Sequence, residues 1–258
     1  MDFIDLKAQQ KIIRKRIDER IKSILDHGKY IMGPEVHELE ERLADFTDSK
    51  YCISCSSGTD ALLIPLMAKG IGPGDAVITT PFTYIATAEV ISLLGAEPVF
   101  VDIYPETFNI DPSGIENAIE DSKSKGLTPK AIIPVDLFGL PARYRIIERK
   151  ARKFDFFLLE DGAQGFGGSI KGKKSCAFGD VAATSFFPAK PLGCYGDGGA
   201  IFTNVDNLAK LFRSIRVHGQ GSDRYENVRL GKYEWYVGFE MVILYLRYME
   251  RRPGKYSL

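Results

Sequence analysis

The chain has 258 residues, enough for one large domain with a substantial core or for a large and a small domain together. Lys and Arg total 34, as do Asp and Glu, so the net charge is 0 and no overall basic field favours a nucleic-acid partner. The longest late apolar run, at residues 241–245, is far shorter than the roughly 20 residues of a membrane helix, and the first residues do not resemble a signal peptide. These features predict a cytoplasmic globular protein that binds neither nucleic acid nor a membrane.

Four cysteines are spread over the chain, and only Cys52 and Cys55 are close in sequence. They form a C-x-x-C in an apolar, strand-like run, with no second pair or histidine cluster nearby. Free thiols in a reducing compartment are therefore favoured over zinc or redox chemistry, and no metal site is predicted.

The N-terminal segment is predicted to form two amphipathic helices, at residues 6–26 and 34–46. Gly28 ends the first helix and Gly33-Pro34 begins the second. Helix pairs with both charged and apolar faces often pack against a neighbouring subunit.

From residue 50 onward, strand patterns alternate with helix patterns. This alternation requires crossover connections, and it predicts an α/β fold with a mostly parallel sheet between helices. In such sheets, ligands bind at the carboxyl ends of the strands. The predicted strands are residues 51–55, 76–79, 98–101, 131–135, 156–160, 181–186 and 200–203, and the predicted helices are residues 59–68, 83–94, 112–123, 142–153 and 206–217.

A candidate nucleophile stands in the small and apolar stretch of residues 182–202, which contains a single cation, Lys190, between Pro188 and Pro191. Lysine normally keeps its ammonium hydrated. Burial on a stiff, apolar turn would disfavour the ammonium form and free the nitrogen lone pair. The alternative is an exposed loop lysine.

Two further strand ends carry binding groups. Residues 56–60 join a strand to a helix N-terminus, where free backbone N–H groups and the helix dipole favour an anion. Ser57 or Thr59 could equally be a plain helix N-cap. Tyr84 opens the next predicted helix and could present its ring face to a planar cofactor, or it could be a core aromatic.

The remaining strand ends supply an acid and a hydroxyl. Asp161 ends an apolar strand, where an unpaired carboxylate would be costly, so it needs a cationic partner such as a protonated pyridine nitrogen. An N-cap role is the alternative for Asp161. Ser185 stands five residues before Lys190 and offers a hydroxyl to a phosphate. An anion cradle, an aromatic face, a buried acid and an amine are the groups that pyridoxal phosphate requires.

Six stretches together resemble the DegT/DnrJ/EryC1/StrS family of pyridoxal phosphate-dependent sugar-nucleotide aminotransferases. They occur in the family's order up to about Gly231. The stretches are residues 5–9 (DLKAQ), 30–36 (YIMGPEV), 57–62 (SGTDAL), 80–87 (TPFTYIAT), 160–167 (EDGAQGFG) and 185–199 (SFFPAKPLGCYGDGG).

The resemblance implies a role for each candidate residue. Lys190 is the lysine that forms the internal aldimine and moves a proton on the substrate. Asp161 pairs with the pyridine nitrogen, Gln164 lies at the ring hydroxyl and Tyr84 covers the ring face. The phosphate is held by the Ser185 hydroxyl and by the backbone of three successive residues, Gly58, Thr59 and Asp60.

The resemblance also implies the fold and the partners. The fold is the type I fold of pyridoxal phosphate-dependent transferases, with an aspartate-aminotransferase-like large domain, in a homodimer with active sites at the subunit interface. The amino donor is glutamate and the acceptor is a nucleotide-linked keto-sugar. Residues 27–36 and 187–195 look most like the branch that aminates a 3-keto UDP-N-acetylglucosaminuronic acid for surface polysaccharide.

The chain departs from the family after residue 231. Residues 1–231 are predicted to hold the N-terminal helices and the large domain, and residues 232–258 an atypical tail where family members carry a further motif and a small C-terminal domain. We hypothesise a frameshift at this point; the alternative is a divergent tail. A second functional hypothesis is a catalytically incompetent remnant that still binds the cofactor or dimerises. Dehydration chemistry is less favoured, because it requires histidine in place of Lys190.

Overall fold

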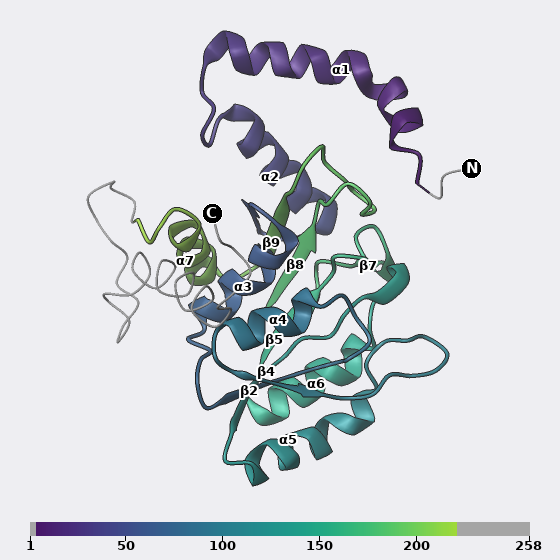
Figure 1. The fold of residues 1–258 in the computed structure, drawn as a ribbon, viewed down its shortest axis with the longest axis vertical. Helices are drawn as coiled ribbons and strands as arrows, with labels where there is room; N and C mark the ends of the chain where they lie inside the picture. The colour runs from purple at the N-terminus through teal and green to yellow at the C-terminus, as the bar shows by residue number, and fades with distance from the viewer. Residues whose placement is uncertain (1–3, 221–258) are drawn as a thin grey trace, which may run out of the picture.

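The computed structural model describes residues 4–220, which are built on a seven-stranded sheet in the order β1-β9-β8-β5-β4-β2-β3 (Figure 1). β9 is antiparallel to both of its neighbours, and the other six strands run in one direction. The predicted α/β class with a mostly parallel sheet is confirmed. The strands are β1 (Tyr51–Cys55), β2 (Asp75–Thr79), β3 (Glu97–Phe100), β4 (Thr128–Ile132), β5 (Phe157–Asp161), β8 (Val181–Ser185) and β9 (Gly199–Thr203), and a separate hairpin pairs β6 (Ser169–Ile170) with β7 (Lys173–Lys174).

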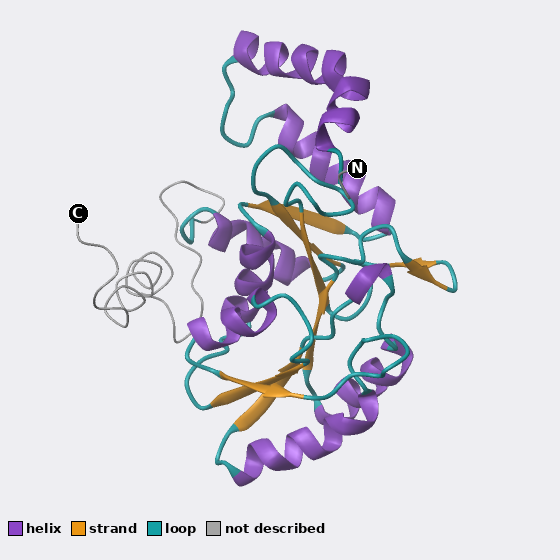
Figure 2. Cartoon of the chain, turned by 45° about the vertical axis from the view of Figure 1, so that its right-hand side comes forward, coloured by secondary structure: helices purple, strands orange, loops and turns teal. Residues whose placement is uncertain are grey.

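Helices cover both faces of the sheet (Figure 2). Three of them, α3 (Gly58–Ala68), α4 (Ala86–Leu93) and α7 (Asp206–Arg216), pack on one face. The other face carries α5 (Ile115–Ser124) and α6 (Tyr144–Phe154). Side chains on a strand alternate between the two faces, so each strand end offers different residues to the two layers.

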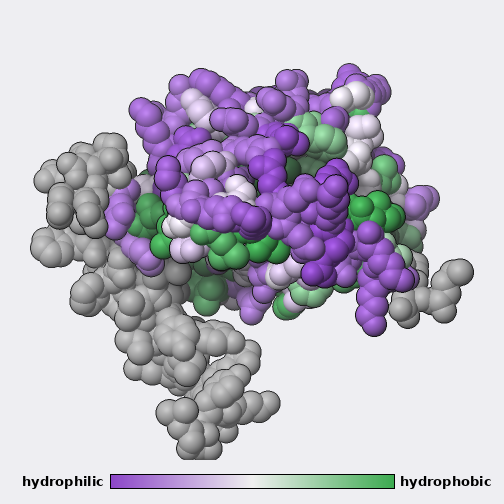
Figure 3. Space-filling model, turned by 90° about the horizontal axis from the view of Figure 1, so that it is seen from above, coloured by the Kyte–Doolittle hydropathy of each residue, from purple (hydrophilic) through white to green (hydrophobic). Residues whose placement is uncertain are grey.

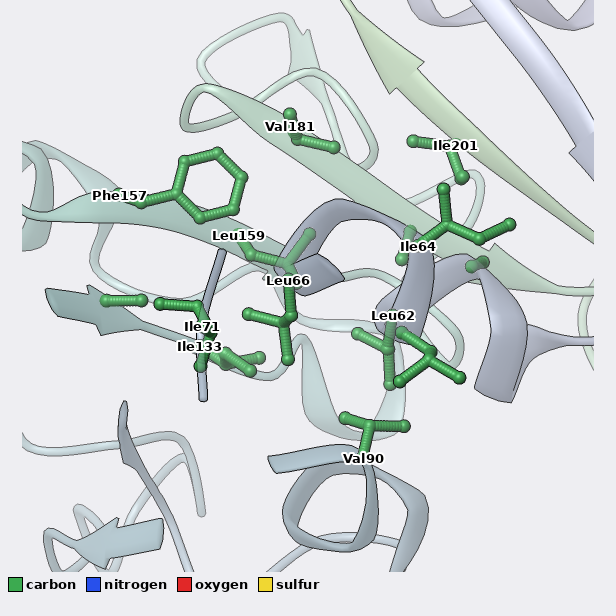
Figure 4. Close-up of a cluster of buried hydrophobic side chains, with 14 of the residues drawn as sticks. Leu62, Ile64, Leu66, Ile71, Val90, Ile133, Phe157, Leu159, Val181 and Ile201 are labelled. Carbon is green, nitrogen blue, oxygen red and sulfur yellow. The ribbon is translucent and has the colours of Figure 1, made fainter. Parts of the chain in front are cut away.

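The central strand β5 shows this alternation. Leu159 packs with Leu66 of α3 and Val181 of β8 in the larger apolar cluster (Figure 4). Leu158, one residue earlier, belongs to the cluster under α6 that contains Ile147. Consequently the last two residues of β5 also face opposite layers.

The two N-terminal helices are α1 (Leu6–His27) and α2 (Pro34–Thr47), close to their predicted bounds. Gly28 ends α1 in the left-handed conformation, with φ of 68°. α1 lies at one extremity of the molecule and has no buried residue (Figure 1). Figure 3, seen from above that end, shows a largely hydrophilic face crossed by an interrupted band of hydrophobic residues.

Three local expectations were wrong in position. The helix predicted from residue 83 begins at Ala86, because Thr80 accepts a bond from the Phe82 amide (3.2 Å) and holds the preceding residues in a turn. The strand predicted at residues 131–135 lies earlier, as β4. Helix α5 begins at Ile115, after a short 3-10 helix, η1 (Pro112–Gly114).

Within residues 4–220, no helix is long and apolar enough to cross a membrane. The predicted domain boundary at residue 231 and the proposed frameshift lie outside the described residues.

Candidate active site

A cavity of about 460 Å³ lies at the carboxyl ends of β1, β5 and β8. This is the edge of the sheet where ligands were expected. Seven of the eight residues predicted for the site line this cavity. They are Gly58, Thr59, Tyr84, Asp161, Gln164, Ser185 and Lys190.

Asp60 does not line the cavity. Its carboxylate is bonded to the Ser56 hydroxyl, and its backbone N–H donates to Ser57 Oγ at 3.0 Å. Ser57 is therefore the N-cap of α3, one of the two roles that its sequence context allowed. The Asp60 amide is therefore occupied by a hydrogen bond within the chain.

The start of α3 has the properties of an anion cradle. The amides of Gly58 and Thr59 donate no hydrogen bond to any atom of residues 4–220. A Cβ on Gly58 would overlap the side chain of Ser185, so only glycine lets β8 approach this closely. A Cβ on Gly199 would likewise overlap the carbonyl group of Ser57. The helix end and the Ser185 hydroxyl therefore face the same space.

Asp161 is buried, with 4% of its surface exposed. Its Oδ2 accepts a hydrogen bond from the Thr87 hydroxyl at 2.8 Å, and its Oδ1 accepts one from the Ala163 amide at 3.2 Å. Burial raises the pKa of the Asp161 carboxyl, and the charge of Lys190 opposes that rise. No helix begins at Asp161, so the N-cap alternative does not apply.

Lys190 lies in the 186–198 loop that joins β8 to β9. The loop is held by its own backbone: Lys190 N–H donates to the Phe187 carbonyl (2.8 Å), and Cys194 N–H donates to the Phe186 carbonyl (2.8 Å). The Lys190 side chain is half-buried and lines the cavity, so it is not a fully exposed loop lysine.

Two more predicted residues complete the wall of the cavity. Tyr84 is 67% exposed, which excludes the alternative that it is a core aromatic. Gln164 Oε1 accepts a hydrogen bond from the Phe138 amide at 3.2 Å, which ties this side chain to the short helix η2 (Leu137–Gly139).

Sequence reasoning missed a polar group directly behind the site. Glu160 and Asp136 are both fully buried and share hydrogen bonding to the Ser175 hydroxyl. The sequence contained one signal of it: a glutamate precedes Asp161 in an apolar strand, on the opposite face of the sheet. Nothing in the sequence showed that Asp136 would face it.

The four cysteines are free thiols. Burial raises the pKa of Cys55 to about 12 and raises the pKa of Cys52 further. Both are therefore protonated and poorly reactive at neutral pH.

Comparison with known proteins places this arrangement in one family. The sequence model of the DegT/DnrJ/EryC1/StrS aminotransferase family matches residues 11–242. The UDP-2-acetamido-2-deoxy-3-oxo-D-glucuronate aminotransferase of Pseudomonas aeruginosa is 58% identical over 233 residues, covering 90% of this chain and 62% of that protein. The chain thus spans about three fifths of the length of this curated relative.

Two crystal structures share the fold. A DegT DnrJ EryC1 StrS aminotransferase from Brucella abortus superposes with a TM-score of 0.87 at 49% identity, over 95% of this chain and 68% of that one. NtdA from Bacillus subtilis, with bound cofactor PMP, superposes with a TM-score of 0.75 at 34% identity, over 83% of this chain and 47% of that one. The chain has the fold of these aminotransferases and belongs to the DegT/DnrJ/EryC1/StrS aminotransferase family.

Proposed function

We propose that this chain is the cofactor-binding part of a pyridoxal phosphate-dependent aminotransferase that moves an amino group, from glutamate, to the keto group of a nucleotide-linked sugar for glycan biosynthesis. The supporting observation is that the Lys190 amine, the buried Asp161 carboxylate and the open N-terminus of α3 line one cavity of about 460 Å³.

The residues present fit pyridoxal phosphate. The amides of Gly58 and Thr59, which donate to no atom of the described residues, and the Ser185 hydroxyl match the acceptor oxygens of a phosphate at a helix N-terminus. Asp161 forms no ion pair within residues 4–220, and a protonated ring nitrogen would supply its missing cation. A Cβ at position 58 would collide with the Ser185 side chain, so the glycine keeps the helix N-terminus close to the Ser185 hydroxyl.

The residues divide the chemistry among them. When bound, pyridoxal phosphate supplies an aldehyde that condenses with amines and a ring that accepts electrons. Lys190 supplies the amine that attaches the cofactor, and its Nζ carries the proton that moves during transfer. Asp161 would keep the ring nitrogen protonated, and Thr87 holds the Asp161 carboxylate in place through its 2.8 Å hydrogen bond. Tyr84 and Gln164 line the same cavity, where Tyr84 would cover one face of the ring and Gln164 would contact the ring hydroxyl.

A 3-keto UDP-N-acetylglucosaminuronic acid is the acceptor we infer. The 58% identity to the Pseudomonas aeruginosa enzyme, whose name specifies a 3-oxo-glucuronate derivative, supports this inference. Purified protein is assayed with glutamate against 3-keto and 4-keto sugar nucleotides side by side. Turnover of a 4-keto sugar alone would refute the 3-keto assignment.

A homodimer is the assembly we infer, because α1 leaves large apolar residues uncovered within one protomer. Ile12 is 80% exposed, and Ile21 and Leu25 are also exposed. Sedimentation measures the assembly directly. A monomer at micromolar concentration would contradict the inference. Substitution of the exposed Ile12 should weaken the assembly, whereas substitution of Lys15, which is exposed on the same helix, serves as the polar control.

The decisive test concerns attachment of the cofactor to Lys190. Wild-type protein loaded with pyridoxal phosphate is expected to show the visible absorbance band of a lysine-attached cofactor, and glutamate is expected to bleach it. Lys190→Ala removes the band, whereas Lys125→Ala, at an exposed surface ion pair, keeps it. Borohydride reduction and peptide mapping should label Lys190. A label elsewhere refutes the assignment, and a stable band without transfer to any keto-sugar identifies an incompetent remnant.

A further inference from the structure

Two acids lie behind the candidate site with no exposed surface. Glu160 and Asp136 are both 0% exposed. Glu160 precedes Asp161 in β5, so its side chain projects to the opposite face of the sheet, toward the cluster that contains Leu158. The pair is therefore separated from the cavity by the thickness of one strand.

Glu160 uses both carboxyl oxygens as acceptors. Oε1 accepts from the Cys176 amide at 2.5 Å, and Oε2 accepts from the Phe178 amide at 2.7 Å. Both donors follow the hairpin of β6 and β7, so Glu160 fixes the segment after that hairpin to the central strand.

Asp136 is held equally firmly. Its Oδ1 accepts from the Tyr144 hydroxyl at 2.7 Å and from the Ala142 amide at 3.1 Å. Its own backbone N–H donates to the Asp161 carbonyl at 2.9 Å. Asp136 thus contacts the backbone of the residue whose carboxylate enters the cavity.

The Ser175 hydroxyl lies between the two acids, 2.6 Å from Asp136 Oδ2 and 3.0 Å from Glu160 Oε1. A hydroxyl has one hydrogen and can donate to one of them at a time. Neither acid takes part in an ion pair within the described part of the chain. The titratable groups that face the pair are Tyr144 and Cys176, and the charge of Asp136 also acts on Asp161 across the strand. Burial raises the pKa of both acids.

We propose that Asp136 and Glu160 hold one proton between them through the Ser175 hydroxyl, and that this one-proton unit positions the end of β5 that carries Asp161. In the arrangement with all donors used, the carboxylic acid of Glu160 donates to Ser175 Oγ, which donates to the Asp136 carboxylate. Two charges at this depth without a cation would be strongly unfavourable, whereas one charge with several donors is tolerable.

The unit also supports the turn that follows Asp161. A Cβ on Gly165 would collide with Asp136 and with Ser175, so this turn, which carries Gln164, packs directly on the unit. Asp136 and Glu160 are therefore positioning residues, and their link to catalysis rests on the proposed function.

Asp136→Asn is the informative variant. The carbonyl oxygen of the introduced side-chain amide can keep the bonds from Tyr144 and Ala142, and its nitrogen can donate to Ser175, which then donates to an ionised Glu160. The variant thus keeps the geometry and the single charge but removes the need for a shared proton. Asp136→Ala removes the bonds as well.

Infrared difference spectra at pH 7 test the proton without any cofactor. A protonated carboxyl has a C=O band that a carboxylate lacks. Because Asp161 can also hold a proton in the cofactor-free chain, Asp161→Asn is used as the background. We expect one such band in Asp161→Asn and its loss when Asp136→Asn is added. Glu40→Gln, which changes a buried glutamate paired with Arg216, should leave the band unchanged. An Asp161→Asn spectrum without the band, or a band that survives when Asp136→Asn is added to it, overturns the shared proton.

Pyridoxal phosphate affinity tests the positioning role. Asp136→Asn should bind with nearly wild-type affinity, whereas Asp136→Ala should bind about 10-fold to 100-fold more weakly, as is typical of supporting partners around a ligand site. If Asp136→Ala does not fold, Ser175→Ala serves in its place with the same expectation. Equal affinities for wild type and the alanine variant overturn the positioning role. Failure of wild-type protein to bind the cofactor instead refutes the proposed function, and the infrared result still decides on the proton.

Discussion

Two buried glutamates in this chain are stabilised in opposite ways. Glu40, on α2, is 7% exposed and its Oε1 lies 2.6 Å from the Arg216 guanidinium of α7. Glu160, in β5, faces another acid, Asp136, across a serine hydroxyl. The first arrangement ties two helices together with compensating charges, and the second places an acid pair directly behind the candidate site. Burial alone therefore does not determine charge state; the partner that the fold supplies does.

The largest effect is expected when the cation of the first pair is removed. Arg216→Ala leaves Glu40 buried without its counter-charge and should lower the free energy of unfolding by about 3–5 kcal/mol. Urea denaturation measures the loss. Because the Glu40 carboxylate also accepts a bond from the Ser54 amide (2.9 Å), the double variant Arg216→Met with Glu40→Gln should recover much of it. A loss below about 1 kcal/mol would show that the ion pair contributes no more than an exposed one.

A smaller effect is expected on the acid pair. Tyr144→Phe removes the hydroxyl that donates to Asp136 at 2.7 Å but keeps the ring, which stacks on Phe178 with centroids 4.3 Å apart. Loss of a buried bond to a charged acceptor should cost about 1.5–3 kcal/mol of unfolding free energy. Unchanged stability in the same urea assay would indicate that Asp136 needs no donor there, and so that it is not the charged member of the pair.

The contribution of Asp161 to the stability of the folded chain should depend on pH. Since burial raises the pKa of Asp161, the folded chain keeps this proton at pH values where the unfolded chain has lost it. Stability without cofactor therefore falls as pH rises from the ordinary carboxyl range through the raised pKa. Asp161→Asn avoids this loss, and it should be about 0.5–2 kcal/mol more stable at pH 8.

At low pH the Asp161 carboxyl is protonated in both the folded and the unfolded chain. The stability advantage of Asp161→Asn should therefore shrink toward pH 4. The Thr87 hydroxyl can reorient to the Tyr84 carbonyl and accept from the new amide, so the variant keeps its hydrogen bonds. A variant less stable than wild type at pH 8 would contradict the expected sign.

The smallest effect is expected when an exposed ion pair is broken. Lys50 and Asp206 are 2.7 Å apart, but their side chains are 54% and 58% exposed. Lys50→Ala should therefore leave the urea midpoint nearly unchanged, and added salt should screen most of any remaining difference. A loss as large as that of Arg216→Ala would mean that exposure does not separate the two classes of pair.

Much of the fold could be predicted from the sequence because its strands are short apolar runs between turn residues. The strand at residues 51–55 and the helix beginning near Pro34 occur where the pattern placed them. The hairpin of β6 and β7 was missed because strands of two residues carry no periodic signal. The late start of α4 depends on one side-chain bond, from the Phe82 amide to Thr80, which pattern alone does not reveal.

Some features of the candidate site could also be predicted from the sequence, and others could not. Residues at strand ends, such as Asp161 and Lys190, were identifiable because parallel topology brings these ends together. The occupied amide of Asp60 follows from which side chain caps α3, and the sequence offered both Ser57 and Thr59 as candidates. The pairing of Asp136 with Glu160 spans residues that only tertiary packing brings into contact.

The close passage of Gly199 beside the Ser57 carbonyl has a consequence for how such pockets diversify. Gly199, which follows the 186–198 loop, lies against the first residues of α3 with no side chain between the two backbones. Side chains at the edge of the cavity can therefore change, and ligand preference with them, while the distance between Lys190 and the N-terminus of α3 stays constant. A larger residue at position 199 would instead push β9 away from the N-terminus of α3, whichever ligand binds.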